Sequence, residues 1–167
     1  GLQPVKDYIL SLEDNFKIQQ LRRERGLKAD SPSMHMIFTG NPGTGKTTVA
    51  RIVSRYLKAI GVLEGGQLVE VTRADLVGQY VGHTAPLTQK AMQAALGGVL
   101  FIDEAYSLYR GKDDSFGLEA IDTLVKGMED HRDDLIVILA GYSREMEEFL
   151  TANSGLKSRF PNVIAFP

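Results

Sequence analysis

Five short apolar runs alternate with longer helical patterns along most of this 167-residue chain. The apolar runs lie at Met34–Phe38, Leu68–Val71, Val99–Ile102, Leu135–Leu139 and Val163–Phe166. The helical patterns that separate them cover Lys46–Ile60, Ala85–Leu96, Phe116–His131 and Ser143–Ala152. Such alternation is typical of βαβ units, in which helices cover both faces of a parallel sheet. The sequence therefore predicts a doubly wound α/β fold with three layers and a parallel five-stranded sheet.

One more helix is predicted ahead of the first strand, over residues 4–25. Pro4 suits the first turn of such a helix, and Gly26 is a fitting stop. Apolar residues recur between them at the three- and four-residue spacing of an amphipathic helix, namely Val5, Tyr8, Ile9, Leu12 and Phe16. The whole chain, residues 1–167, is thus predicted to be one domain.

The composition excludes several classes of protein. The net charge of −2 and the pI of about 5.9 lack the basic excess of a nucleic-acid or anionic-membrane binder. The chain has no cysteine and only three histidines, which removes disulfide frameworks, thiolate metal sites and cysteine nucleophiles. No apolar run approaches the roughly 20 residues that span a bilayer, and residues 1–9 do not form a signal peptide. We expect a cytoplasmic domain with no nucleic-acid or membrane partner.

The residues after the first apolar run match the phosphate-loop pattern G-x-x-x-x-G-K-[ST] in full. They are Gly40, Asn41, Pro42, Gly43, Thr44, Gly45, Lys46 and Thr47. Glycines let such a loop turn successive N–H groups toward phosphate oxygens, and the following helix adds its positive N-terminal end. The pattern predicts that Lys46 reaches the β- and γ-phosphates of a nucleotide and that the Thr47 hydroxyl binds Mg²⁺.

Two adjacent carboxylates, Asp103 and Glu104, end the apolar run Val99–Ile102. Ligands of open α/β sheets bind beyond this end of the strands. Successive side chains of a strand point to opposite sides, so the two carboxylates are expected to have different roles. Asp103 best fits the metal, and Glu104 best fits a base that polarises water. Guanine selectivity normally uses an [NT]-K-x-D strand end, which the sequence lacks, so ATP is the expected nucleotide.

Together these motifs resemble those of the AAA+ ATPases, and within them the group that contains red-type rubisco activase and stage V sporulation protein K. The resemblance rests on Met36–Thr48 (MIFTGNPGTGKTT), Leu68–Pro86 (LVEVTRADLVGQYVGHTAP), Gly97–Leu108 (GGVLFIDEAYSL), Leu135–Met146 (LIVILAGYSREM) and Gly155–Phe160 (GLKSRF). The residues of Glu119–Lys126 and Gly141–Met146 resemble those of the sporulation protein more than those of the rubisco activase.

The resemblance implies a P-loop NTPase fold that corresponds to the large AAA+ subdomain, with the C-terminal helical lid absent from this chain. It also implies Mg²⁺-dependent ATP hydrolysis coupled to the remodelling of a protein client, which the sequence does not name. The full-length protein would act as a ring, a homo-hexamer. The implied nucleotide contacts extend from Gly40 to Thr48.

The resemblance places further roles outside the phosphate loop. Tyr80 and Val81 fall at the aromatic-hydrophobic-glycine pore loop that grips a client polypeptide. Arg159 falls at the arginine finger, which a neighbouring subunit supplies to the γ-phosphate. The implied catalytic residues are then Lys46, Asp103, Glu104 and Arg159. Outside the resemblance, Asp113 and Asp114 follow the Asp103-Glu104 strand in a loop and are interpreted as a solvated loop tip or a second pore loop rather than a metal pair.

One departure from the AAA+ pattern lies at the end of the fourth strand, where these proteins usually carry a polar sensor such as Asn. Here the sequence reads Ala140-Gly141-Tyr142-Ser143, and either Tyr142 or Ser143 could substitute. Two other functions stay open, a P-loop kinase that acts on a small molecule and a scaffold that binds ATP without turnover. The adjacent Asp103 and Glu104 argue against the kinase, because a water-activating carboxylate is a liability there.

Overall fold

The computed structural model describes residues 3–27 and 33–167. The domain predicted over residues 1–167 also includes positions 1, 2 and 28–32, which lie outside the described residues. Among the described residues, no helix is both long enough and apolar enough to cross a membrane.

Five strands form one sheet in the order β2-β3-β4-β1-β5, and every neighbouring pair is parallel. The central strands β3, β4 and β1 are buried along their whole length because helices cover both of their faces. The predicted α/β fold is therefore confirmed. The strand bounds are β1 (Met36–Thr39), β2 (Leu68–Val71), β3 (Gly98–Ile102), β4 (Leu135–Gly141) and β5 (Asn162–Ala165).

The predicted helices are all present, and their ends differ from the predicted bounds by a residue or so. Three short elements, α3, η1 and α7, were not predicted, because one turn is too short to show a periodic pattern. The helices are α1 (Gln3–Glu24), α2 (Lys46–Ala59), α3 (Arg73–Leu76), α4 (Thr84–Ala95), α5 (Ser115–Asp130), α6 (Ser143–Ala152) and α7 (Ser154–Lys157), and η1 (Ala105–Leu108) is a 3-10 turn.

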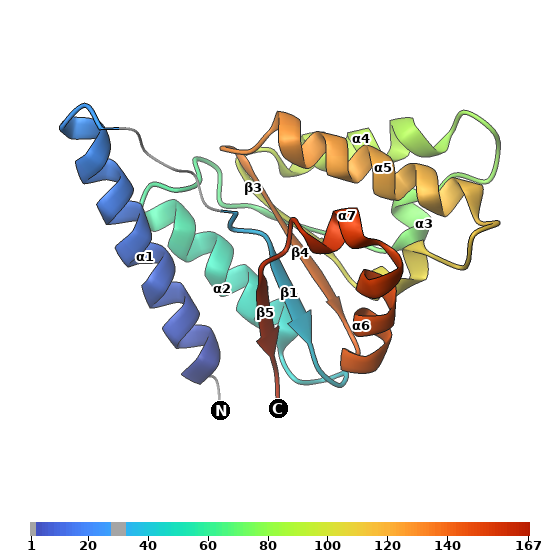
Figure 1. Cartoon of the computed structure of the whole chain (residues 1–167), viewed down its shortest axis with the longest axis horizontal. Coiled ribbons are helices and arrows are strands. Elements are labelled where there is room, and N and C mark those ends of the chain that lie inside the picture. Colours follow the sequence, from blue (N-terminus) through green and yellow to red (C-terminus); the bar gives the residue numbers. More distant parts are fainter. Residues whose placement is uncertain (1–2, 28–32) are drawn as a thin grey trace.

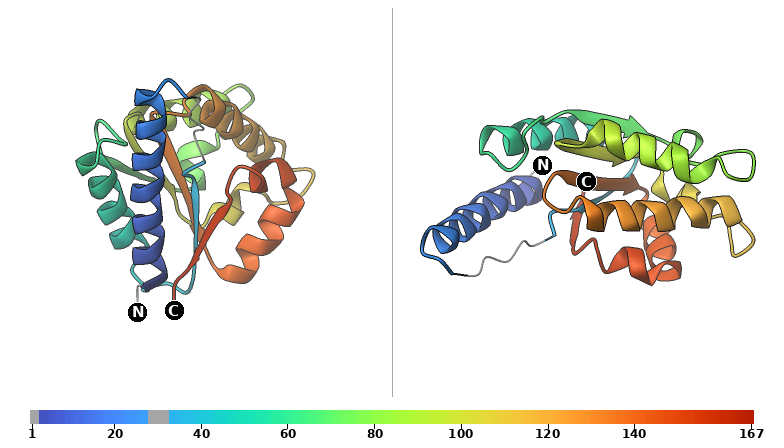
Figure 2. Two further views of the ribbon diagram at one scale, coloured as in Figure 1. Left: turned by 60° about the vertical axis from the view of Figure 1, so that its left-hand side comes forward. Right: turned by 90° about the horizontal axis from the view of Figure 1, so that it is seen from above.

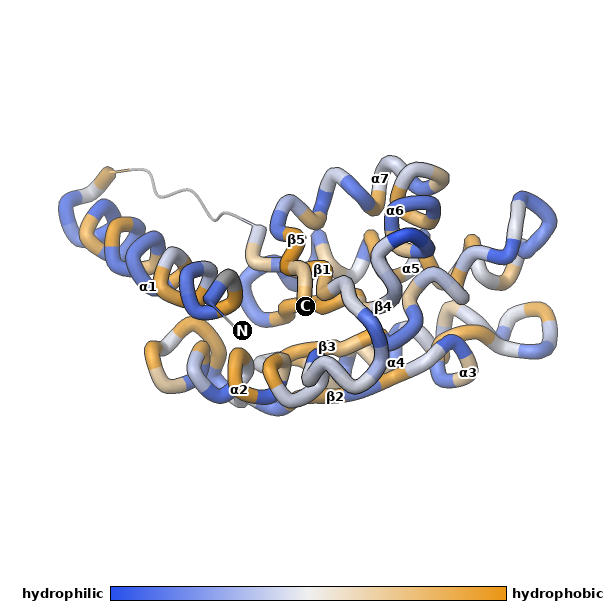
Figure 3. Tube along the Cα trace, turned by 90° about the horizontal axis from the view of Figure 1, so that it is seen from below, coloured by the Kyte–Doolittle hydropathy of each residue, from blue (hydrophilic) through white to orange (hydrophobic). Residues whose placement is uncertain are grey.

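Two hydrophobic clusters hold the three layers together, one on each face of the sheet. Helices α1 and α2 pack on one face, where Met36 and Phe38 point. Helices α3 to α7 pack on the other face, where Ile37 points. Figures 1 and 2 show the sheet between these helices, and Figure 3 shows hydrophobic residues along the strands. The alternating side chains of the strands thus feed two separate cores.

Candidate nucleotide-binding site

A cavity of about 330 Å³ lies at the end of the sheet where the strands finish. Its walls come from the end of β4 and from the segments that follow β1, β3 and β4, which are neighbours in the sheet. Open parallel sheets bind ligands at this end, in the crevice that forms beyond the carboxyl ends of the strands where the strand order reverses. The lining residues are Gly40, Pro42, Gly43, Thr44, Gly45, Lys46, Thr47, Thr48, Asp103, Glu104, Gly141 and Tyr142.

The loop between β1 and α2 follows the geometry that its sequence predicts. Gly45 directly precedes α2 and has a φ of 88°, in the left-handed region that glycine adopts without steric strain. Helix α2 begins at Lys46, so the free N–H groups of its first turn lie at the wall of the cavity. These N–H groups and the partial positive charge of the helix end make this wall suitable for an anion.

Lys46 lies inside the loop rather than in solvent. Its Nζ donates hydrogen bonds to the carbonyl oxygens of Gly40 at 2.7 Å and Asn41 at 2.9 Å. The Thr44 hydroxyl donates to the same Asn41 oxygen. Asn41 is absent from the lining of the cavity, so its carbonyl serves the shape of the loop.

Asp103 and Glu104 both line the cavity, although neighbouring residues of a strand would point apart. The reason is the backbone of Glu104, which has φ 48° and ψ 47° in the left-handed region. A non-glycine residue held there is strained by about 1 kcal/mol or more, and such strain clusters at functional sites. The chain thus turns directly after β3, and the Asp103 Oδ1 accepts a hydrogen bond from the Glu104 N–H at 2.9 Å.

The donor set of the cavity fits a magnesium ion. The Thr47 hydroxyl and the Asp103 carboxylate line the same space, and both offer the oxygen ligands that Mg²⁺ prefers. Within the described ranges, no group of three or more His, Asp or Glu side chains gathers to hold a metal. At nucleotide sites, Mg²⁺ is usually bound by only one or two protein side chains, and phosphate oxygens and water complete its coordination.

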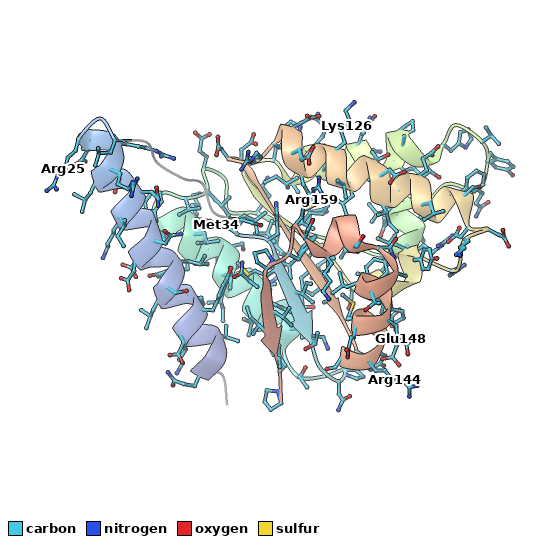
Figure 4. All side chains as sticks on the ribbon, viewed as in Figure 1. Arg25, Met34, Lys126, Arg144, Glu148 and Arg159 are labelled. Atoms are coloured by element: carbon cyan, nitrogen blue, oxygen red, sulfur yellow. The ribbon has the colours of Figure 1, made fainter. Side chains whose placement is uncertain are left out.

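Arg159 lies far from this cavity, at the end of the sheet where the strands begin (Figure 4). Its Nη1 donates to the Gly155 carbonyl oxygen, and its Nη2 forms an ion pair with Glu129. A second cavity of about 940 Å³ borders Arg159 and Glu129 there. The structure therefore does not bring Arg159 together with the other predicted catalytic residues of the same chain.

Tyr80 and Val81 lie on the segment between α3 and α4. Neither lines the cavity of about 330 Å³ that borders the glycine loop, which we call the phosphate cavity. Their exposed fractions are 66% and 89%. Among the described aromatic pairs, Tyr80 contacts His83 alone. The two rings lie in a T-shaped arrangement with 5.5 Å between their centroids. Tyr80 is thus a surface aromatic rather than a core residue.

The interpretation of Asp114 as a solvated loop residue is wrong. Its carboxylate forms a two-point ion pair with Arg73, with distances of 2.7 and 3.0 Å, and it accepts the Gly117 N–H at the start of α5. Arg73 also donates to the Ser107 carbonyl oxygen in η1. The sequence did hold one signal, because Asp is a preferred residue at the position before a helix. Asp113 is exposed, as predicted.

Comparison with known proteins gives relatives that match the whole chain. The family model described as "ATPase family associated with various cellular activities (AAA)" matches residues 36–167. Stage V sporulation protein K of Bacillus subtilis (strain 168) is 54% identical over 167 residues, which are 100% of this chain and 52% of that protein. Protein CbbX of Cereibacter sphaeroides is 52% identical over 168 residues, which cover 100% of this chain and 54% of that protein.

A chloroplastic ribulose bisphosphate carboxylase/oxygenase activase, from Cyanidioschyzon merolae (strain NIES-3377 / 10D), is 51% identical over 168 residues, which cover 100% of this chain and 57% of that protein. These relatives confirm the predicted group, and the identity is slightly higher with the sporulation protein than with the activase. The chain spans about half the length of the curated relatives it matches.

Proposed function

The chain belongs to the ATPase family associated with various cellular activities (AAA), and from this premise we propose that it binds Mg·ATP and hydrolyses it to drive protein remodelling in a ring. One observation carries the proposal: the glycine loop, Lys46, Asp103 and Glu104 all line one cavity at the carboxyl end of a parallel sheet. A cavity with an anion-binding loop on one side and two carboxylates on the other suits a nucleoside triphosphate with its bound metal ion.

Four polar residues of the cavity, Lys46, Thr47, Asp103 and Glu104, have a role in this proposal. Lys46 and the N–H groups of the loop bind the β- and γ-phosphates. Thr47 and Asp103 would hold Mg²⁺, which when bound neutralises charge on the phosphates. Glu104 accepts a proton from the attacking water as a general base. Its exposure fits this role, since the base must reach a water molecule beside the terminal phosphate.

The position of Arg159 supports action between subunits. Arg159 lies at the opposite end of the sheet from its own phosphate cavity, so its guanidinium could neutralise charge only on the nucleotide of another copy. A repeated head-to-tail contact generates a ring when the rotation between copies closes and an open filament when it does not, and we propose the closed form, a hexamer. Tyr80 and Val81, being exposed and apolar, are proposed to grip the client polypeptide.

The test compares the protein with its Glu104→Gln variant, with Glu147→Gln as a control at an exposed carboxylate on α6. Glutamine fills the space of glutamate but cannot take the proton, so ATP should stay bound while turnover falls by about 100-fold or more. Nucleotide affinity is measured by calorimetry and turnover by phosphate release. Hydrolysis by Glu104→Gln at the parent rate would contradict the proposal, and a parent that binds ATP without turnover would indicate the scaffold.

The proposed remodelling of a client protein is tested with the same Glu104→Gln variant. Because Glu104→Gln holds ATP, it should retain client protein, and the retained proteins can be identified after purification in ATP. Adding Tyr80→Ala should release them while the affinity for ATP stays the same. Equal retention by the single and double variants would remove Tyr80 from the proposed client contact.

A further inference from the structure

Arg73 joins three segments of the chain although it does not line the phosphate cavity. It is the first residue of α3, the short helix that follows β2. Its Nη1 donates hydrogen bonds to the Ser107 carbonyl oxygen at 2.8 Å and to Asp114 Oδ2 at 2.7 Å, and its Nη2 donates to Asp114 Oδ1 at 3.0 Å. One mostly buried guanidinium thus connects α3 to the η1 turn and to the start of α5.

Glu104 lies between two contacts that hold its stretch of chain against the segment from β2 to α3. Before it, the Asp103 N–H donates to the Val71 carbonyl oxygen at 3.0 Å. After it, the Ser107 N–H donates to the carbonyl oxygen of Glu104 at 2.9 Å, and the Ser107 carbonyl oxygen accepts the bond from Arg73. The turn that begins at Glu104 is therefore held on both sides.

The backbone of Glu104 requires such support. Its φ of 48° and ψ of 47° lie in the left-handed region, and a strained conformation of this kind persists only where the surrounding structure enforces it. The Glu104 carboxylate makes no hydrogen bond or ion pair with another described residue. The direction of this carboxylate therefore depends on the backbone that carries it.

Asp114 fixes the guanidinium in its place. Besides the two bonds from Arg73, its carboxylate accepts the N–H groups of Arg110 and Gly117. A Cβ at Gly117 would clash with the Asp114 carboxylate and with the Leu108 carbonyl oxygen, so a glycine lets α5 begin this close to the end of η1. The guanidinium is thus held by a rigid acceptor and can in turn hold η1.

We propose that Arg73, oriented by Asp114, is a positioning residue for Glu104: it holds the η1 turn and thereby the backbone that directs the Glu104 carboxylate into the phosphate cavity. The inference rests on the proposed function, because it requires Glu104 to act as the general base. A catalytic group that is misplaced by about 1 Å can lose about 100-fold in rate. The phosphate loop follows a different strand, so loss of this support should affect turnover and not nucleotide binding.

The test measures kcat for ATP and the affinity for a non-hydrolysable ATP analogue with Mg²⁺ in Arg73→Met and in the parent, at a temperature where a thermal melt shows both folded. Methionine occupies much of the space of the arginine stem and makes none of its hydrogen bonds. We expect kcat to fall by about 10-fold or more while analogue affinity stays the same. The matched control is Arg51→Met, which removes the exposed ion pair with Glu70 of β2 and should leave both values unchanged.

A second background separates positioning of the base from a general loss of structure. In Glu104→Gln the base is already removed, so adding Arg73→Met should lower the residual single-turnover rate no further. In the parent background, Asp114→Asn keeps the shape of the side chain and weakens its hold on Arg73. It should lower kcat by a smaller factor with analogue affinity unchanged, and it decides the question if Arg73→Met does not fold.

An unchanged kcat in Arg73→Met would overturn the inference, as would an unchanged kcat in Asp114→Asn where that variant decides. So would an undiminished loss of rate in the Glu104→Gln background, or a loss of analogue affinity as large as the loss of kcat. The proposed function fails on different results, namely no turnover by the parent or hydrolysis by Glu104→Gln at the parent rate. A parent whose turnover depends on Glu104 and not on Arg73 would refute this inference alone.

Discussion

The two ends of the sheet are held together in different ways. At the end where strands finish, the side-chain hydrogen bonds of the residues that line the smaller cavity are local: Lys46 bonds to Gly40 and Asn41, six and five positions away, and Asp103 accepts the N–H of Glu104. At the end where strands begin, the contacts join distant segments. Asn162 donates to the carbonyl oxygens of Ser33 and His35, and Ser33 donates to that of Arg159. A local site can be read as a motif, whereas a site built from distant segments exists only once the chain has folded.

The end where strands begin also has the larger cavity, about 940 Å³ against about 330 Å³. One of its polar lining residues, His35, serves the fold. His35 is buried, its Nδ1 accepts the Val137 N–H, and burial lowers the pKa of His35 to about 4. The imidazole is therefore neutral at pH 7 and acts as part of the core. The choice of the smaller cavity as the candidate nucleotide site thus rests on the chemistry of its lining and not on its volume.

The largest expected effect in this comparison comes from Lys46→Ala. Removing the ammonium group takes away a charge-assisted contact with the phosphates, so ATP affinity should fall by about 10- to 100-fold. The melting temperature should hardly change, because Lys46 bonds only to loop carbonyls. Calorimetry and a thermal melt measure both, with Lys126→Ala as a control at an exposed lysine on α5. Unchanged ATP affinity would show that the phosphate loop does not bind the nucleotide.

A smaller effect is expected at the ion pair between Arg73 and Asp114, whose side chains are 17% and 12% exposed. The Arg73 guanidinium, and then the backbone N–H groups of Gly117 and Arg110, hold the pKa of Asp114 at about 2, below its ordinary 3.8. A carboxyl with a lowered pKa stabilises the fold above its unfolded pKa, and this stability is lost as the pH falls through the folded value. The contribution is about 1–2 kcal/mol at pH 7.

Asp114→Asn should therefore lower the free energy of unfolding by about 1–2 kcal/mol at pH 7. The difference from the parent should shrink as the pH falls from about 4 to about 2, because the parent then loses the same charge. Urea unfolding across that range measures it, and Asp113→Asn, at the exposed neighbour, is the control. An equal difference at pH 7 and at pH 2 would mean that the ion pair is not its source.

Most of the fold could be predicted from the sequence because long helices and buried strands have recognisable hydrophobic patterns. Buried central strands read as continuous apolar runs, and helices such as α5 show a periodic apolar face. The bounds of the longer elements were predicted to within about two residues. Elements of a single turn, such as α3 and α7, carry no period and were missed.

The candidate site could be predicted as far as its residues are neighbours in the sequence. The phosphate loop and the Asp103-Glu104 pair are each contiguous in the sequence, so each could be recognised from its own pattern, and both follow strands of a parallel sheet, which predicts that they lie at the same edge. The left-handed backbone of Glu104 gave no such signal, because it is unusual for a non-glycine residue. The bonds of Arg73 to Asp114 and of Arg159 to Glu129 join residues 41 and 30 positions apart. Only the folded chain selects such partners.

The smallest expected effect is that of Glu129→Gln, at the end of the sheet far from the phosphates. Exposed ion pairs contribute about 0–1 kcal/mol because water and salt screen them, and the side chains of Arg159 and Glu129 are 30% and 59% exposed. The free energy of unfolding should fall by less than about 1 kcal/mol, and ATP affinity should not change. Urea unfolding and calorimetry measure the two values.

The control is Glu148→Gln, which removes the exposed pair with Arg144 near the phosphate end (Figure 4). If Glu129→Gln alone changed ATP affinity, the two ends of the sheet would be coupled within one chain, and the proposal that Arg159 acts only on the nucleotide of another copy would be wrong.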